Sequence, residues 1–470
     1  MHAKAILVVC LLIATALTAI AASPSARAGT LINEQLVEDL ATTTALGGGD
    51  AVFVRFGADA AFGVVYGTDA SPNNIYIVAI KARYLGVAQV VDTQGREVAS
   101  NRPIKIYTLY AVKLDNILEF RDSNGNDIAD YARVYNESTE RFSDYVNAGD
   151  TLYKKADLHR NWTRGPIVRE NTTTSRSWTF NLTAQGLPYD RISGWTGSIA
   201  GSLDLVRFTF HLNASLEQVD NATVPQWRVT VGTLAGRYFM TDVERLTDLT
   251  VSGKVVRYDL KWDQEFQGWD YVPGNGPPAR HLLLELNAIV GNFIPASVVD
   301  AWVESRLLAR MAESGTARFN GTAGERTANE TTRNLASPDR LRSPYVDFGG
   351  NWTRIARFVW VTDSVVDGVT TPMYGQVMAG WRFIAIGERG NAFAGFVLLA
   401  GLSYEGGTTI VHDPDVQTDV QADLQLPGAP DGGGLFAAAV GAVVIIAILL
   451  LVAFVVSKRR KKESPPPPGA

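Results

Sequence analysis

Residues 205–211 read Leu-Val-Arg-Phe-Thr-Phe-His, a run of branched and aromatic side chains with the two-residue period of a β-strand. Similar runs recur along most of the chain, and turn-rich spacers such as residues 92–95 separate them. The further runs are residues 51–55, 74–80, 104–110, 178–183, 357–361 and 393–399. Hydrophobic residues make up 46% of the sequence and charged residues 19%, which indicates a folded core. We therefore expect a mainly β protein whose outer region is a large antiparallel β-sandwich-type or barrel-like structure of one or two domains.

Two segments depart from the strand pattern and are expected to form short helices. The first covers residues 34–46. The second follows Pro295 and covers residues 297–312, with Ser297 as its N-cap. Its apolar residues recur at three- and four-residue steps and so share one face: Val299, Trp302, Val303, Leu307 and Met311. We expect this helix to lie over a sheet.

An uncharged stretch near the C-terminus, residues 435–456, has the composition of a transmembrane helix. At about 1.5 Å of rise per residue it is long enough to cross the ~30 Å hydrocarbon core of a bilayer. A basic block follows it, made of Lys458, Arg459, Arg460, Lys461 and Lys462. The positive-inside rule then places the tail in the cytoplasm and residues 29–434 outside the cell. The sequence predicts a single-pass type I protein of the cell membrane.

The N-terminal segment, residues 1–28, has the layout of a secretory signal peptide, with cleavage expected after Ala28 or Ala21. The only cysteine of the chain, Cys10, lies inside it. The mature protein is therefore expected to contain no disulfide and no cysteine ligand or nucleophile.

Asn-x-Ser/Thr sites are more frequent than the composition of the chain would give by chance, which favours N-glycosylation. The predicted acceptors are Asn136, Asn161, Asn171, Asn181, Asn213, Asn221, Asn320, Asn329 and Asn351. Many acceptors without any cysteine in the outer region point to a prokaryote that glycosylates its exported proteins, and we expect an archaeal source.

The composition also suggests how the chain is divided. We expect a first β-rich part at residues 29–150 and a second at 151–410, which contains the helix near 297–312. Aspartates alternate with Pro, Gly and Gln over residues 411–434, which we interpret as an acidic flexible stalk. The transmembrane helix and a basic cytoplasmic tail at residues 457–470 complete the chain.

One segment resembles the calcium loop of EF-hand or dockerin proteins. Asp122, Asn124, Asn126 and Asp130 occupy loop positions 1, 3, 5 and 9, and the carbonyl of Ile128 stands at position 7. Calcium prefers such oxygen ligands, and alternate spacing can curl them around one point. The segment departs from the pattern twice. Asp127 replaces the usual glycine at position 6, and Arg133 replaces the usual glutamate at position 12.

A β-turn is the alternative for the same segment. Asn124-Gly125 is a strong hairpin signal, and it would join residues 117–120 to residues 131–134. The calcium loop is the sequence's one candidate cofactor site.

Catalysis has little support in the sequence, and no catalytic residue is predicted. His159, His211, His281 and His412 lie outside any paired metal-ligand spacing, and no nucleophile elbow occurs. Two carboxylate pairs are conceivable for a glycosidase, Asp263 with Glu265 and Asp270 with Glu285.

Trp262 and Trp269 stand among acidic and amide residues, as in a sugar site, although tryptophans usually fill cores. Nucleic acid is not expected as a partner, because the net charge is −5.

These observations favour a non-catalytic, N-glycosylated surface protein with an adhesion, envelope or ligand-binding role, whose ligand is an extracellular glycan or protein. The alternative is a membrane-tethered extracellular hydrolase such as a glycosidase. A third interpretation is an accessory subunit of an envelope complex, contacting its partners through the transmembrane helix.

Overall fold

The computed structural model describes fourteen segments of the chain. They are residues 34–38, 49–56, 60–133, 135–136, 141–142, 145–192, 194–234, 237–294, 316–321, 324–328, 339–341, 345–350, 353–386 and 392–424. Within these segments every regular element is a β-strand. The prediction of a mainly β, antiparallel protein is confirmed.

The first fourteen strands are β1 (Glu34–Glu38), β2 (Asp50–Phe56), β3 (Ala60–Tyr66), β4 (Ile75–Asp92), β5 (Glu97–Arg121), β6 (Tyr131–Ala132), β7 (Tyr135–Asn136), β8 (Arg141–Phe142), β9 (Val146–Asn147), β10 (Thr151–Asp157), β11 (Thr163–Arg164), β12 (Val168–Asn171), β13 (Ser175–Arg191) and β14 (Ser202–Val224). The others are β15 (Gln226–Leu234), β16 (Arg237–Arg245), β17 (Leu249–Gln267), β18 (Arg280–Ile294), β19 (Thr316–Gly321), β20 (Gly324–Ala328), β21 (Asp339–Leu341), β22 (Tyr345–Gly350), β23 (Thr353–Trp360), β24 (Asp363–Val366), β25 (Val369–Ile386), β26 (Ala392–Glu405), β27 (Thr409–His412) and β28 (Pro414–Leu424).

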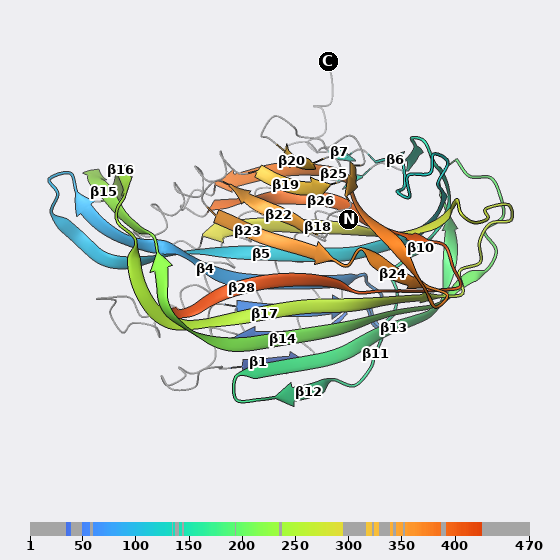
Figure 1. The fold of residues 1–470 in the computed structure, drawn as a ribbon, viewed down its shortest axis with the longest axis horizontal. Helices are drawn as coiled ribbons and strands as arrows, with labels where there is room; N and C mark the ends of the chain where they lie inside the picture. The colour runs from blue at the N-terminus through green and yellow to red at the C-terminus, as the bar shows by residue number, and fades with distance from the viewer. Residues whose placement is uncertain are drawn as a thin grey trace, which may run out of the picture.

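Ten of these strands form a closed ring of antiparallel pairs. The order around the ring is β5, β18, β26, β25, β24, β27, β17, β14, β13 and β10, and β10 pairs with β5 again. In Figure 1, β14 and β17 run along one side of the molecule, and β5 lies next to β18 on the other. The sandwich of two separate sheets is not confirmed, because β10 on one side and β24 with β27 on the other connect the two halves.

The main core fills the inside of this ring. Alternate residues of β13 and β14 point inward, as their two-residue period predicts: Trp178, Phe180, Phe208 and Phe210 are at most 2% exposed. They belong to one cluster with Leu114, Leu284 and Leu286 of the opposite strands. Burial of each large apolar side chain stabilises the fold by roughly 1.5–3 kcal/mol.

A second, smaller core lies on the outer surface of β5 and β18. Leu118 and Phe120 of β5 and Leu283 of β18 pack there against Tyr131 and Tyr145. The two tyrosines come from the segment between β5 and β10, residues 122–150. Of its described residues, Ala129, Tyr131 and Tyr145 cover this part of the sheet. The segment also carries the predicted calcium loop.

Two local predictions are wrong where the structure describes them. Residues 34–38, the start of the first expected helix, form β1, because pairing with β2 satisfies their backbone groups. Residues 411–424, the start of the expected flexible stalk, lie in β27 and β28, which both pair with β17.

The two expected parts of the outer region share one sheet. β5 belongs to residues 29–150, and its neighbours β10 and β18 belong to residues 151–410. The other predicted segments lie outside the described residues: the signal peptide at 1–28, the helix at 297–312, the transmembrane helix at 435–456 and the tail at 457–470. The described part of the chain contains no helix with the length and apolarity that a membrane span needs.

Candidate functional site

The predicted calcium loop follows β5 and wraps around the carboxylate of Asp122, which is 5% exposed. Oδ1 of Asp122 accepts hydrogen bonds from the backbone N–H groups of Asn124 (3.2 Å) and Gly125 (2.8 Å). Oδ2 accepts one from the N–H of Asp127 (2.7 Å). The first predicted ligand thus fixes the path of the loop.

The other predicted side-chain ligands converge on Asp130. The carboxamides of Asn124 and Asn126 both donate to Oδ2 of Asp130, the latter over 3.0 Å. Oδ1 of Asn126 accepts from the N–H of Ile128, whose side chain is buried. Loop positions 3, 5 and 9 therefore meet at one point, and half a turn of each carboxamide would place its oxygen beside the Asp130 carboxylate.

The hairpin alternative is wrong. Gly125 does adopt a left-handed turn conformation, with φ of 73°. However, β5 pairs with β10 and β18, and β6 pairs with β9, so the strands on either side of the turn do not pair with each other. Asp127, which replaces the usual glycine, also has positive φ, 59°, and takes the conformation that glycine would supply.

Asp127 brings a further ligand set to the loop that the sequence did not predict. Asp122, Asp127 and His281 each present one ligand atom, and these atoms lie within 4.8 Å of one another. His281 is buried at the start of β18, and its ring stacks on Phe120. Its Nδ1 lies 3.2 Å from the carbonyl of Ala279, which can only accept, so Nδ1 carries the hydrogen. The other ring nitrogen, Nε2, faces Asp127 and lies 3.7 Å from Oδ1 of that residue.

Asp150 adds negative charge beside the loop. Its two oxygens accept hydrogen bonds from the N–H groups of Ser123 and Asp130, each over 2.8 Å. Burial raises the pKa of the Asp150 carboxyl to about 6; the two hydrogen bonds oppose this rise, and the carboxylates of Asp130 and Asp122 add to it. A divalent cation at the loop would relieve this repulsion.

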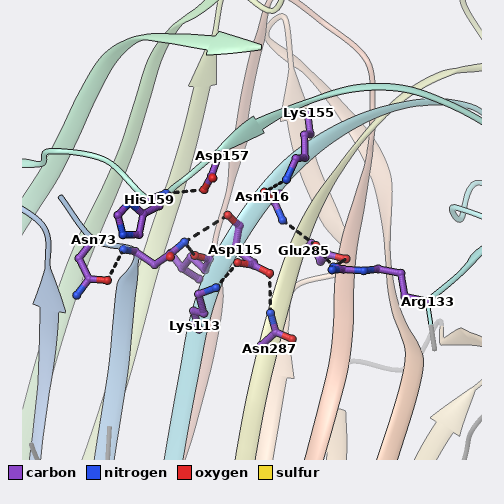
Figure 2. A network of polar contacts seen from close by, with 12 residues as sticks. Asn73, Lys113, Asp115, Asn116, Arg133, Lys155, Asp157, His159, Glu285 and Asn287 are labelled. Carbon is purple, nitrogen blue, oxygen red and sulfur yellow. Dashed lines mark hydrogen bonds and ion pairs between the residues drawn. The ribbon is translucent and has the colours of Figure 1, made fainter. Parts of the chain in front are cut away.

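Arg133, at the position where a calcium loop usually has glutamate, is a structural anchor. Its guanidinium lies 3.0 Å from both carboxylate oxygens of Glu285, which is fully buried on β18 (Figure 2). The hydroxyls of Tyr131 (2.9 Å) and Tyr145 (2.7 Å) also donate to this carboxylate. Burial, and next the charge of Glu285, raise the pKa of both tyrosines, so their hydroxyls stay protonated. The network fixes Tyr131, Arg133 and Tyr145 to the sheet.

Three of the four acids in the predicted carboxylate pairs are engaged in polar contacts of the fold. Asp263 and Glu265 lie on the outer face of β17, where they bond to His211 (2.9 Å) and Arg207 (2.7 Å) of β14. Glu285 is saturated by the donors just described, whereas Asp270 is exposed. The pairs therefore belong to a surface ladder of charges and to a structural network.

The two tryptophans proposed for sugar binding lie in the core. Trp262 is 0% and Trp269 is 5% exposed, and both belong to the main cluster. The indole N–H of Trp269 donates to Glu119 over 2.9 Å, so its polar atom is satisfied inside the protein. A sugar could not stack on either ring without unfolding the core.

The predicted glycosylation sites are accessible wherever the structure describes their side chains, apart from one. Asn161, Asn171, Asn213 and Asn221 are exposed, and Asn181 is partly buried. Asn136 and Asn320 lie in β7 and β19, but their side chains are outside the description, and Asn329 and Asn351 lie outside the described residues altogether.

Known proteins give no further guidance. No protein-family model matches the chain, and a search of curated proteins finds no significant match.

Proposed function

We propose that this protein is a single-pass, N-glycosylated surface protein whose β-rich region lies outside the cell and acts by binding rather than catalysis. The observation that carries this proposal is the placement of the acceptor asparagines. Asn213 lies on β14 between the buried residues Leu212 and Ala214, so the two-residue period turns its side chain to the outer face. Asn171 at the end of β12 is exposed as well. An oligosaccharide can be attached at these positions without disturbing the core.

The distribution of acceptors also supports a protein partner over a glycan. Five acceptor sites, Asn161, Asn171, Asn181, Asn213 and Asn221, fall within or beside β11–β14, whereas none occurs in β4, β5, β18 or β26. The three of these strands that belong to the ring, β5, β18 and β26, would therefore carry no sugar of their own, and the acceptor Asn136 lies in β7, in the segment that follows β5. The burial of Trp262 and Trp269 removes the candidate sugar site. The anchor at residues 435–456, the cytoplasmic tail and the archaeal source are parts of the same proposal.

The loop at residues 122–130 would hold calcium as a structural cofactor. The convergence of Asn124, Asn126 and Asp130, together with the excess negative charge from Asp150, supports this assignment. Bound calcium would fix the segment between β5 and β10, which covers the second core. Its role would then be stability of the outer region, with no part in a reaction.

The surface-glycoprotein proposal is tested on protein from the membranes of the native host. Peptides that contain Asn171 and Asn213 should carry an added sugar mass, and the intact protein should remain in the membrane after extraction at high pH. Cleavage by protease added to whole cells should remove the outer region. Unmodified peptides at both sites, together with protein recovered from the soluble cytoplasmic fraction, would refute it.

A further inference from the structure

A β-bulge in β5 brings three reactive groups together. β5 and β18 pair through Leu114 opposite Leu286 and Asn116 opposite Glu285, and Asp115 is the extra residue between these pairs. On the same outer face, Lys113 of β5 stands directly opposite Asn287 of β18. In antiparallel strands the Cβ atoms of such a pair lie about 4.5–5.5 Å apart.

Asp115 connects the amine of Lys113 to the carboxamide of Asn287 (Figure 2). Nζ of Lys113 hydrogen-bonds Oδ1 of Asp115, and Nδ2 of Asn287 donates to Oδ2 over 2.8 Å. The side chains of Lys113 and Asp115 are only 11% and 9% exposed. On its other side, Lys113 stands opposite Tyr76 of β4, which is buried. Water therefore has little access to the amine and the carboxylate, and Asn287 is partly buried.

We propose that Lys113 and Asn287 become joined by an intramolecular isopeptide bond, with Asp115 as the acid–base group. Oδ1 of Asp115 first takes one proton from the ammonium, which frees the lone pair on Nζ. Nζ then attacks Cγ of Asn287. As the C–N bond forms, Asp115 gives its proton to Nδ2 and takes a second proton from Nζ. The Cγ–Nδ2 bond breaks and ammonia leaves, so the amine and the carboxamide become a secondary amide without any oxidant, reductant or cofactor.

The first proton transfer is set by the surroundings of Lys113. Burial, the largest single effect, lowers the pKa of its ammonium, but the charges of Asp115, Tyr76 and Asp157 and the hydrogen bond to Asp115 together raise the pKa above its ordinary value, so the pair starts in the charged form. The shared hydrogen bond between the two groups supplies the path along which the proton moves. The reaction is therefore expected to be slow, to follow folding, and to need no enzyme.

A second group of the same residue types lies nearby and provides a matched comparison. Lys155 donates to Oδ1 of Asn116 over 3.2 Å, and Nδ2 of Asn116 donates to Glu285 over 2.9 Å. Here the lysine contacts the amide and not the acid. Arg133 and two tyrosine hydroxyls already donate hydrogen bonds to the side chain of Glu285. Among the described contacts, no hydrogen bond leads from Lys155 to Glu285, so no acid is placed to take a proton from this lysine and no bond is expected to form.

An isopeptide bond at this place would tie two neighbouring strands of the ring covalently. The outer region has no cysteine, because the only one is Cys10, so a disulfide cannot supply such a tie. The inference does not depend on the proposed function, since it needs only the folded outer region.

The test is a tryptic digest of the denatured full-length protein, analysed by mass spectrometry. The expected product is a branched peptide that joins residues 106–121 to residues 281–306, uncut after Lys113 and lighter by one ammonia than the two peptides together. Linear peptides alone, cut after Lys113, would overturn the proposal, as would a branch at Lys155. The wild-type digest decides this point, whatever the variants do.

Variants then test the roles of the residues. Lys113→Arg keeps the charge next to Asp115 but removes the nucleophile, and the branched peptide should disappear. Asp115→Asn should also abolish it, and a branch that persisted would exclude Asp115 as the acid–base group. Lys155→Arg is the matched control and should leave the full yield of branched peptide.

Discussion

The guanidinium of Arg133 lies 3.0 Å from the carboxylate of Glu285, where the Glu285 side chain has no exposed surface. Their pairing connects the segment that contains the proposed calcium loop to β18. Two tyrosine hydroxyls and one amide complete the coordination of the carboxylate. The stability of this part of the molecule should therefore depend on a polar network as much as on its apolar contacts.

Glu285→Gln tests this dependence. The substitution leaves Arg133 buried beside a neutral group, and breaking a buried pair in this way costs about 3–5 kcal/mol of unfolding free energy. Denaturant unfolding of the variant and the wild type measures the difference. Glu265→Gln is the control, because its pair with Arg207 is partly exposed, and it should cost no more than about 1 kcal/mol. Equal losses in the two variants would contradict a special role for the buried network.

Asp150 should make the stability of the cation-free protein depend on pH. Its folded pKa, about 6, lies above the value of an unfolded aspartate, so the folded state prefers the protonated form. For this group alone, the unfolding free energy is therefore greatest below pH 4, and it falls by about 3 kcal/mol as the pH rises through 6. Unfolding in EDTA at several pH values measures this loss. Asp150→Asn should remove it, and an unchanged slope in that variant would refute the assignment.

His412 should act in the opposite direction. It is buried in β27, where its Nε2–H donates to the carbonyl of Val361 over 2.8 Å. Burial lowers the pKa of the imidazole to about 4, so its contribution to stability is present above pH 6.5 and is lost as the pH falls toward 4. The loss amounts to about 3 kcal/mol. His412→Gln should flatten the acid side of the stability curve, whereas the exposed His159→Gln should not; a steep acid side in both variants would contradict the prediction.

The sequence predicted the class of the fold because the two-residue period is clear in strands that supply the core. Residues 178–183 and 205–211 alternate as expected, and β13 and β14 turn their aromatic residues into the core. The closure of the ring could not be predicted, since it depends on the short strands β10, β24 and β27, which pair only in the folded protein. At residues 411–424 the many aspartates mask a strand period. From Asp415 onward polar residues alternate with apolar or small ones, as Val416 and Val420 show, and this is a strand pattern.

The candidate cation loop was predictable in part, because a local sequence pattern marks some of its residues. Asp122, Asn124, Asn126 and Asp130 are local in sequence, and their spacing alone brought them together. His281, Asp150 and Glu285 come from distant parts of the chain, and no local pattern identifies them. In the sequence, Arg133 indicates only that the usual glutamate ligand at loop position 12 is missing. Its pairing with Glu285 of β18 depends on the fold.

Calcium titration of the full-length protein, after removal of metal with EDTA, tests the central claim most directly. Isothermal calorimetry should show a single site with a dissociation constant on the order of 10⁻⁴ to 10⁻³ M, as in extracellular calcium modules, and calcium should raise the melting temperature. Asp130→Asn should weaken binding, whereas Asp248→Asn, an exposed aspartate paired with Arg245, should not. No heat of binding and no change in melting temperature in the wild type would contradict the account.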